Sequence, residues 1–210
     1  MRHLVPALIA AATLLTPAVQ AGTLAVRVVG SDGKAVADAV ISLDPASGQA
    51  PALRIQGKYE VTQKDTQFHP FISVVPVGAT VSFPNFDPFR HHVYSFSPAK
   101  RFELKLFAKD QTRSVTFDKA GVIAVGCNIH DSMSAFIYVT DSIWTARTDA
   151  NGNAVLRDVP AQAMKLTVWH PYLSAPGSQI TEALPASGSD RSKTMSVKLR
   201  PPPMHHMSNY

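Results

Sequence analysis

Residues 121–140 have the sequence GVIAVGCNIHDSMSAFIYVT, and this stretch decides the fold. Its segments 122–125 and 135–139 are short and rich in β-branched or aromatic residues, which predicts two strands. Ile123, Val125 and Cys127 recur at every second position, the period of a half-buried strand. The loop between the two segments carries a thiol, an imidazole and a thioether in C-x-x-H-x-x-M spacing. One tight loop could therefore supply three metal ligands.

The rest of the chain repeats this strand pattern, and helical signals are almost absent. Turn sequences such as Ser31-Asp32-Gly33 and Asn151-Gly152-Asn153 separate short apolar segments. With sixteen prolines and eleven glycines, this pattern predicts an all-β sandwich architecture. The polar stretch Ala46 to Gly57 is expected to be a linker. Further strands are expected at 24–29, 36–43, 74–83, 102–107, 114–117 and 165–169.

Residues 1–21, MRHLVPALIAAATLLTPAVQA, have the features of a secretory signal peptide: a basic start, an apolar stretch and a small-residue end. Cleavage is expected after Ala21. A membrane anchor is the alternative, but the apolar run is shorter than the roughly 20 residues that span a bilayer. We therefore expect a periplasmic protein with no membrane span after cleavage.

Composition limits the possible partners. Hydrophobic residues make up 45% of the chain, enough to bury a core, and the net charge is +5. The lysines and arginines are scattered, with no basic run interleaved with aromatic residues. This distribution argues against nucleic acid and weakly favours an acidic partner.

The chain has a single cysteine, Cys127, although structural cysteines of exported proteins normally occur in pairs. The thiol is either inert and buried or occupied by a ligand. A histidine from the upstream segment FPNFDPFRHHV (83–93), together with His130 and Met133, would complete a redox copper site. Soft sulfur stabilises Cu(I), and imidazole suits both oxidation states. Structural zinc is the chemical rival, but it prefers four firm N, S or O ligands and rarely takes a thioether.

The motifs F-x-N…H-x-V and C-x-x-H-x-x-M resemble those of the cupredoxin family of plastocyanin, pseudoazurin and amicyanin. The resemblance covers about residues 63–140 and implies a Greek-key β-sandwich at 58–141. It further implies one type 1 copper with three equatorial ligands and one axial ligand, namely His91, Cys127, His130 and axial Met133.

The two ends of the chain resemble the halves of the transthyretin-like sandwich of carboxypeptidase regulatory domains. The matching segments are 24–43, two strands around an SDGK turn, and 147–169, with a T-D-x-x-G turn and a V-P step. The resemblance implies that 22–46 and 143–200 form one sandwich into which the cupredoxin domain is inserted, as an exposed loop readily permits. The alternative is a head-to-tail arrangement with 24–43 donated to the second domain. The whole chain resembles bacterial periplasmic proteins, of the methylamine-utilisation or plastocyanin-like type, that join these two parts.

Three residues depart from the family pattern. His92 replaces an asparagine that ties the ligand loops together, so it could restore that hydrogen bond, compete as a ligand or face solvent. Ile129 replaces a proline, and its N–H could donate to the Cys127 sulfur. Asp131 could raise the basicity of His130.

Other imidazole and thioether groups are expected to be peripheral. His69 and His170 each precede a proline, which favours loop or strand-end positions. The tail 201–210 is expected to be disordered, although its Met204, His205, His206 and Met207 could take up copper.

Electron transfer is the expected function. The sequence shows no nucleophile–base pair or paired carboxylates beside the ligands, so we expect no enzyme activity. The expected partner is a cytochrome c or a periplasmic dehydrogenase, and the family resemblance implies an apolar patch around His130 formed by Phe86, Pro88, Phe89 and Met133. The alternatives are a copper carrier or chaperone and a non-redox structural or docking module.

Overall fold

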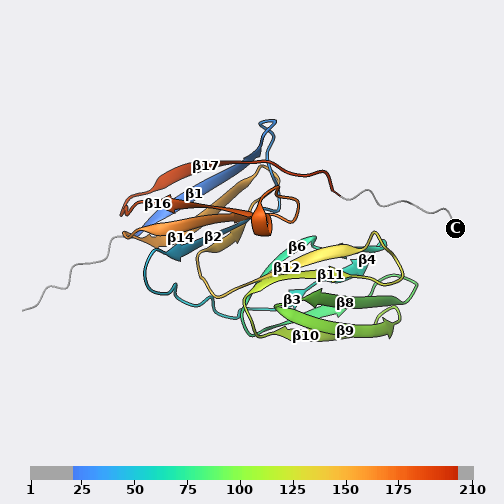
Figure 1. The fold of residues 1–210 in the computed structure, drawn as a ribbon. Coiled ribbons are helices and arrows are strands. Elements are labelled where there is room, and N and C mark those ends of the chain that lie inside the picture. The colour runs from blue at the N-terminus through green and yellow to red at the C-terminus, as the bar shows by residue number, and fades with distance from the viewer. Residues whose placement is uncertain (1–20, 203–210) are drawn as a thin grey trace, which may run out of the picture.

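The computed structural model describes residues 21–202, and within them the chain is built almost entirely of strands (Figure 1). The helical part of this range is one 3-10 turn, Pro176–Ser178. No helix in the range is long and apolar enough to cross a membrane. The expected all-β sandwich architecture is therefore confirmed.

The first sandwich combines the two ends of the described chain. One sheet has the strand order β14-β1-β17, and the other has β13-β2-β15-β16. In Figure 1 the blue strands of the N-terminal end lie among the orange and red strands of the C-terminal end. Their buried faces share one apolar core that includes Leu24, Ile41 and Leu166, all 0% exposed. The strand bounds are β1 Ala21–Gly30, β2 Val40–Pro45, β13 Thr145–Arg147, β14 Asn153–Pro160, β15 Met164–Trp169, β16 Gln179–Leu184 and β17 Arg191–Val197.

The second sandwich is formed by the middle of the chain. A five-stranded sheet, β6-β12-β11-β8-β9, packs against a three-stranded sheet, β10-β7-β3, and β4 and β5 form a small extra sheet. A separate core lies between them and includes Phe83, Phe117 and Ile137. The bounds are β3 Tyr59–Glu60, β4 Thr62–Lys64, β5 Gln67–His69, β6 Ile72–Pro76, β7 Ala79–Pro84, β8 His91–Ser97, β9 Lys100–Phe107, β10 Thr112–Phe117, β11 Gly121–Gly126 and β12 Ser134–Thr140.

An aromatic contact joins the two sandwiches. Trp169, at the end of β15, packs against Phe136 and Tyr138 of β12, with ring centroids 5.8 and 5.6 Å apart. Alternate residues of β12 face the core of the second sandwich, so Phe136 and Tyr138 point out of it. Arg147 adds a hydrogen bond of 3.1 Å from Nη1 to the carbonyl oxygen of Ile72. The first sandwich thereby covers the outer face of the five-stranded sheet at β6 and β12.

Two expected strands have different bounds. The segment 74–83 contains parts of two strands, β6 and β7, because Gly78, with a φ of +87°, turns the chain between them. The strand expected at 36–43 begins only at Val40, because Asp38 lies in a turn with a φ of 61°. Between β2 and β3 no residue of the expected linker forms a strand.

The pairing of β1 and β2 bears on the head-to-tail alternative. β1 pairs with β14 and β17, and β2 pairs with β13 and β15. These partners all belong to the first sandwich, which disagrees with donation of 24–43 to the second. The expected signal peptide at 1–21, except Ala21, and the tail from 203 onward lie outside the described residues.

Candidate metal centre

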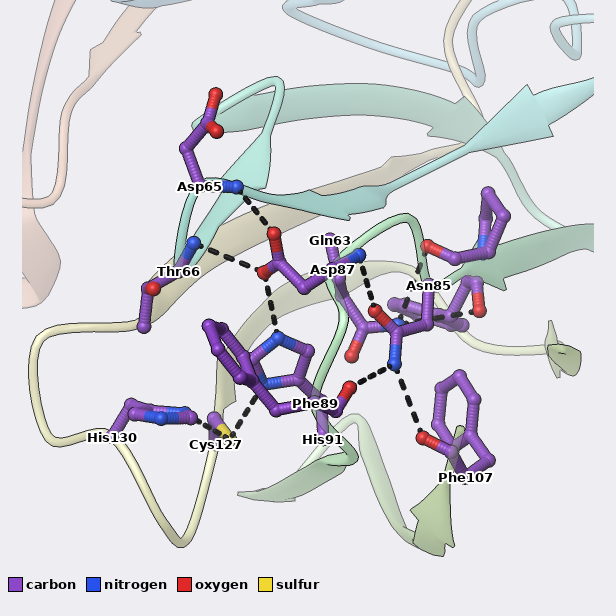
Figure 2. Close-up of polar contacts among 12 residues, drawn as sticks. Gln63, Asp65, Thr66, Asn85, Asp87, Phe89, His91, Phe107, Cys127 and His130 are labelled. Carbon is purple, nitrogen blue, oxygen red and sulfur yellow. Dashed lines mark hydrogen bonds and ion pairs between the residues drawn. The ribbon is translucent and has the colours of Figure 1, made fainter. Parts of the chain in front are cut away.

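Three of the four expected ligands converge at one end of the second sandwich. His91 begins β8, Cys127 directly follows β11, and His130 lies in the loop before β12. The His91 Nδ1 atom lies 3.8 Å from Cys127 Sγ, and His130 Nδ1 lies 3.9 Å from the same sulfur (Figure 2). The three potential ligand atoms all lie within 4.8 Å of one another. His91 and Cys127 are buried, whereas His130 is partly exposed.

Met133, in the same loop as Cys127 and His130, is buried and not at the surface. The Cys127 N–H donates to the Met133 carbonyl at 3.3 Å, and the Met133 N–H donates to the His130 carbonyl at 3.0 Å. These two bonds close the loop tightly. The Met133 side chain is 1% exposed and belongs to the same apolar core as Cys127. The expectation that Met133 forms part of the exposed patch is therefore wrong, because the loop closure turns its side chain inward.

Asp87 is the main residue of the site that sequence reasoning missed. Its Oδ2 lies 2.7 Å from His91 Nε2, on the side of the ring away from Cys127. Both groups are buried, with side chains 0% and 6% exposed for His91 and Asp87. The N–H groups of Asp65 and Thr66 donate to the same carboxylate at 2.7 and 3.0 Å. A carboxylate that accepts from one ring nitrogen orients the imidazole and leaves the other nitrogen free for a metal.

The pKa of Asp87 agrees with this arrangement. Burial raises the pKa of its carboxyl, but the hydrogen bonds from His91, Thr66 and Asp65 outweigh burial and hold the pKa below its usual value. The carboxylate form is thus the one that these donors stabilise. Asp87 stands only four residues before His91, so the sequence offered it as a neighbour. In a loop, however, a spacing of four residues does not predict whether two side chains are in contact.

Asn85 holds the segment that carries Asp87 and His91. It is 0% exposed, and its side-chain amide donates to the carbonyl oxygens of Phe89 and Phe107 at 2.8 and 3.1 Å. Its Oδ1 accepts the Asp87 N–H at 2.9 Å. Figure 2 shows Asn85 bonded on both sides, between the His91 loop and the end of β9. This network limits the freedom of the His91 ring.

The partly exposed imidazole of His130 has a lowered pKa. Burial is the largest cause, the neighbouring His91 adds to it, and the carboxylate of Asp87 opposes it. Asp131 is not among the groups that act on His130, so the expected effect of Asp131 on its basicity is not found. The neutral imidazole favoured by this environment is the form that binds a metal.

His92 points away from the cluster. Its Nε2 lies 2.9 Å from Glu103 Oε1 on the neighbouring strand β9. Because adjacent strand residues face opposite sides of a sheet, His91 and His92 cannot both reach Cys127 from β8. His92 therefore neither competes as a ligand nor bridges the two ligand loops, and its hydrogen bond serves the outer face of the sheet.

The remaining expectations have mixed outcomes. Among the hydrogen bonds of residues 21–202, none joins the Ile129 N–H to the Cys127 sulfur. His69 ends β5 and is exposed, whereas His170 follows β15 and is 7% exposed. His170 Nδ1 accepts the Tyr172 N–H at 3.2 Å, and neither histidine belongs to the cluster.

The donor set fits copper. The three donors that converge, a buried thiol and two imidazole nitrogens, are soft and borderline ligands that suit copper, and the Met133 thioether is buried in the same core as Cys127. A structural zinc site fits less well, since it takes four firm donors and only three converge among the described residues.

Residues 59–140 form a two-sheet sandwich that brings a histidine from the start of β8 to a Cys-His-Met loop, the arrangement expected of a cupredoxin fold. Several solved structures are similar to part of the chain. A copper-containing nitrite reductase from Thermus scotoductus SA-01 is 27% identical over 47% of this chain and only 25% of that one, with a TM-score of 0.39. A purple cupredoxin from Nitrosopumilus maritimus is 19% identical over 40% of this chain and 100% of that one (TM-score 0.36). An amicyanin variant in its Cu(I) form is 22% identical over 48% of this chain and 98% of that one (TM-score 0.38). No protein-family model matches the sequence, and no curated protein matches it significantly.

Proposed function

We propose that this protein carries single electrons through one type 1 copper held by His91, Cys127, His130 and Met133. The observation that carries the proposal is the approach of both imidazole Nδ1 atoms to one thiol, at 3.8 and 3.9 Å. Copper, when bound, would supply a centre that alternates between Cu(II) and Cu(I). The proposed location is the periplasm, which rests on the signal-like sequence of residues 1–21.

The surrounding residues suit electron carriage better than catalysis. Asp87 and Asn85 hold His91 in one orientation, and the backbone bonds of Met133 hold the sulfur loop. Ligands held this firmly need little rearrangement when the oxidation state changes. Four protein ligands would also leave no open position for a substrate.

The direct test is to load the purified protein with Cu(II) and record its visible and EPR spectra. Strong visible absorption from thiolate-to-Cu(II) charge transfer is expected, with one copper per chain. A non-redox structural module predicts a colourless protein without stoichiometric copper, and that result would overturn the proposal.

An apolar surface beside His130 suits docking of a redox protein. Phe89 is 50% exposed, and its ring centroid lies 6.2 Å from those of both His91 and His130. Ile129, next to His130 in the chain, is 48% exposed, and Phe86 is 50% exposed. A small apolar patch of this kind suits a brief redox encounter. The proposed partner is a cytochrome c or a periplasmic dehydrogenase.

Replacing Phe89 with glutamate should slow electron exchange with such a partner. A charge placed beside His130 would be desolvated on docking, so a loss of about tenfold in the exchange rate is expected, with copper content and colour unchanged. Stopped-flow mixing with the partner measures this rate. Val155→Glu, which puts the same charge on a residue 47% exposed in the first sandwich, is the matched control.

A copper carrier predicts a different pattern. In that case deletion of residues 204–210 should impair copper delivery to an acceptor, while Phe89→Glu should not alter electron exchange. That pair of results would contradict electron carriage.

Removal of the Asp87 carboxylate should weaken copper binding. Partners that orient a metal-binding histidine typically contribute 10–100-fold to affinity, so we expect a loss of about that size in Asp87→Ala. Competition titration with a Cu(I) chelator measures it. Asp87→Asn keeps an oxygen that can accept from His91 Nε2 and should recover part of the affinity. Equal affinity in the wild type and both variants would show that Asp87 does not position His91.

A further inference from the structure

A small hairpin packs against the segment that leads to His91. It consists of β4 and β5, and the two-residue turn Asp65-Thr66 joins them. Its base is bonded to that segment, because the carbonyl oxygen of Gln63 accepts the Phe86 N–H at 2.8 Å. The Gln63 side chain is itself 0% exposed. The hairpin and the chain before His91 are therefore packed as one unit.

The turn at the tip of this hairpin has a strained backbone. Asp65 and Thr66 have φ values of 55° and 58°, so both lie in the left-handed region. A hairpin turn of this kind favours Asp-Gly or Asn-Gly, because glycine has no Cβ atom to clash. Threonine is branched at Cβ and rarely adopts this conformation. Such a conformation persists where contacts outside the turn hold it.

The Asp87 carboxylate supplies those contacts. The Asp65 N–H donates to Oδ1 at 2.7 Å, and the Thr66 N–H donates to Oδ2 at 3.0 Å. Oδ2 also lies 2.7 Å from His91 Nε2. Figure 2 shows the carboxylate with the turn on one side and the His91 ring on the other. The Thr66 N–H and the His91 ring thus share one oxygen.

This sharing affects the electron density of the ligand ring. A carboxylate that accepts from a metal-binding imidazole makes that imidazole more basic. A more basic ligand stabilises Cu(II) relative to Cu(I), because the ion of higher charge gains more from donated electron density. Backbone N–H groups that donate to the carboxylate draw charge away from the ring. The Asp87 side chain is 6% exposed, so water competes little with these donors.

We propose that the Asp65-Thr66 turn tunes the candidate copper site: its two N–H groups raise the reduction potential by withdrawing charge from the Asp87–His91 pair. The inference rests on the proposed function. Asp65 and Thr66 act through Asp87, so they are positioning residues. The left-handed conformation of both turns two consecutive N–H groups toward one carboxylate, which gives the strain a purpose.

The hydrogen bonds are tested on metal-free protein by amide hydrogen exchange followed with NMR. The N–H groups of Asp65 and Thr66 should exchange about tenfold faster in Asp87→Ala than in the wild type, because a hydrogen bond to a charged acceptor is lost. The Asn151 N–H, which donates to Asp149 at 2.9 Å in the first sandwich, is the matched reference and should not change. Equal exchange at positions 65 and 66 in both proteins would overturn the proposal.

The tuning is tested on copper-loaded protein by removing a single N–H. Replacing Thr66 with its α-hydroxy acid analogue changes the amide to an ester, which cannot donate to Asp87. The ratio of Cu(I) to Cu(II) affinity should fall about tenfold, the low end of the effect of partners of metal-binding histidines. For one electron this fall lowers the reduction potential by about 59 mV. Spectroelectrochemical titration measures the shift.

The matched control is the same ester at Asn151, which removes an N–H that donates to a carboxylate of the first sandwich. It should leave the reduction potential unchanged. An unchanged potential in the Thr66 ester, or an equal shift in the Asn151 ester, contradicts the proposed tuning.

Two further variants separate tuning from folding of the turn. Thr66→Gly keeps the N–H and relieves the strain, so it should raise the urea midpoint of metal-free protein and leave the potential unchanged. In Asp87→Ala the ester at position 66 should not shift the potential, because its acceptor is absent. A shift of full size in that background would rule out a route through Asp87.

The two levels of inference fail differently. If the loaded protein lacks the colour of thiolate-bound Cu(II), the proposed function fails, whatever hydrogen exchange shows. If the colour is present in every variant but the Thr66 ester leaves the potential unchanged, only the tuning role of the turn fails.

Discussion

Cys127→Ser should abolish the visible absorption of the copper-loaded protein. The absorption requires a thiolate that donates an electron to Cu(II) in the excited state, and a serine hydroxyl cannot provide this transition. The loss should be complete, because Cys127 is the only cysteine in the chain. Affinity for Cu(I) should fall as well, since the softest ligand is removed. Absorption spectra and copper analysis of the purified variant measure both effects.

His92→Asn is the control for this experiment. His92 bonds to Glu103 and faces the opposite side of β8 from Cys127, so its replacement should leave the colour intact. Loss of colour in His92→Asn would make His92 a ligand and would contradict the arrangement described above. Far-UV circular dichroism establishes that Cys127→Ser remains folded, since a buried hydroxyl without a partner costs about 1–3 kcal/mol.

Trp169→Ala should destabilise the protein by about 3–5 kcal/mol, the range for removal of a large buried aromatic side chain. Trp169 is 3% exposed and packs against Phe136 and Tyr138 across the junction of the two sandwiches. Its loss removes apolar contact from both sides at once. We therefore also expect the two sandwiches to unfold in separate transitions. Calorimetry and urea unfolding of metal-free protein measure these changes.

Two variants make this result specific to the junction. Trp144→Ala removes a tryptophan that is 5% exposed within the core of the first sandwich, so it should destabilise that sandwich alone. Trp169→Phe keeps an aromatic ring at the junction and should retain much of the stability. If Trp169→Ala changes the free energy of unfolding by no more than about 0.5 kcal/mol, as ordinary surface substitutions do, the junction does not couple the sandwiches.

Strand content could be predicted from local sequence, but strand number and pairing could not. The segments around Leu24, Ile123 and Leu166 have the β-branched composition and alternation of buried strands, and each is a strand. β16 and β17 were not expected, because their sequences QITEAL and RSKTMSV contain many polar residues and no run of β-branched or aromatic ones. Such strands form because a neighbouring strand supplies backbone hydrogen bonds. The residues of the strand itself do not indicate that this neighbour is present, so the local sequence cannot predict the strand.

The candidate ligands could be found from sequence for a similar reason. Cys127, His130 and Met133 stand in one short loop, where spacing along the chain nearly determines spacing in space. His91 lies 36 residues before Cys127, and its assignment depended on a family resemblance. The structure brings its Nδ1 to 3.8 Å from the sulfur, which spacing alone could not predict.

The sequence by itself determined an all-β chain with a sulfur-rich loop, because alternation and short-range spacing are properties of consecutive residues. Only the tertiary structure decided that Asp87 holds His91, that His92 turns outward to Glu103, and that Tyr94 covers Gly126. Each of these contacts depends on how a loop folds back or on which residues of two strands lie opposite each other. A shift of one residue in the register of β8 would turn every one of its side chains to the other face, so the surroundings of the site are set by the packing of both sheets.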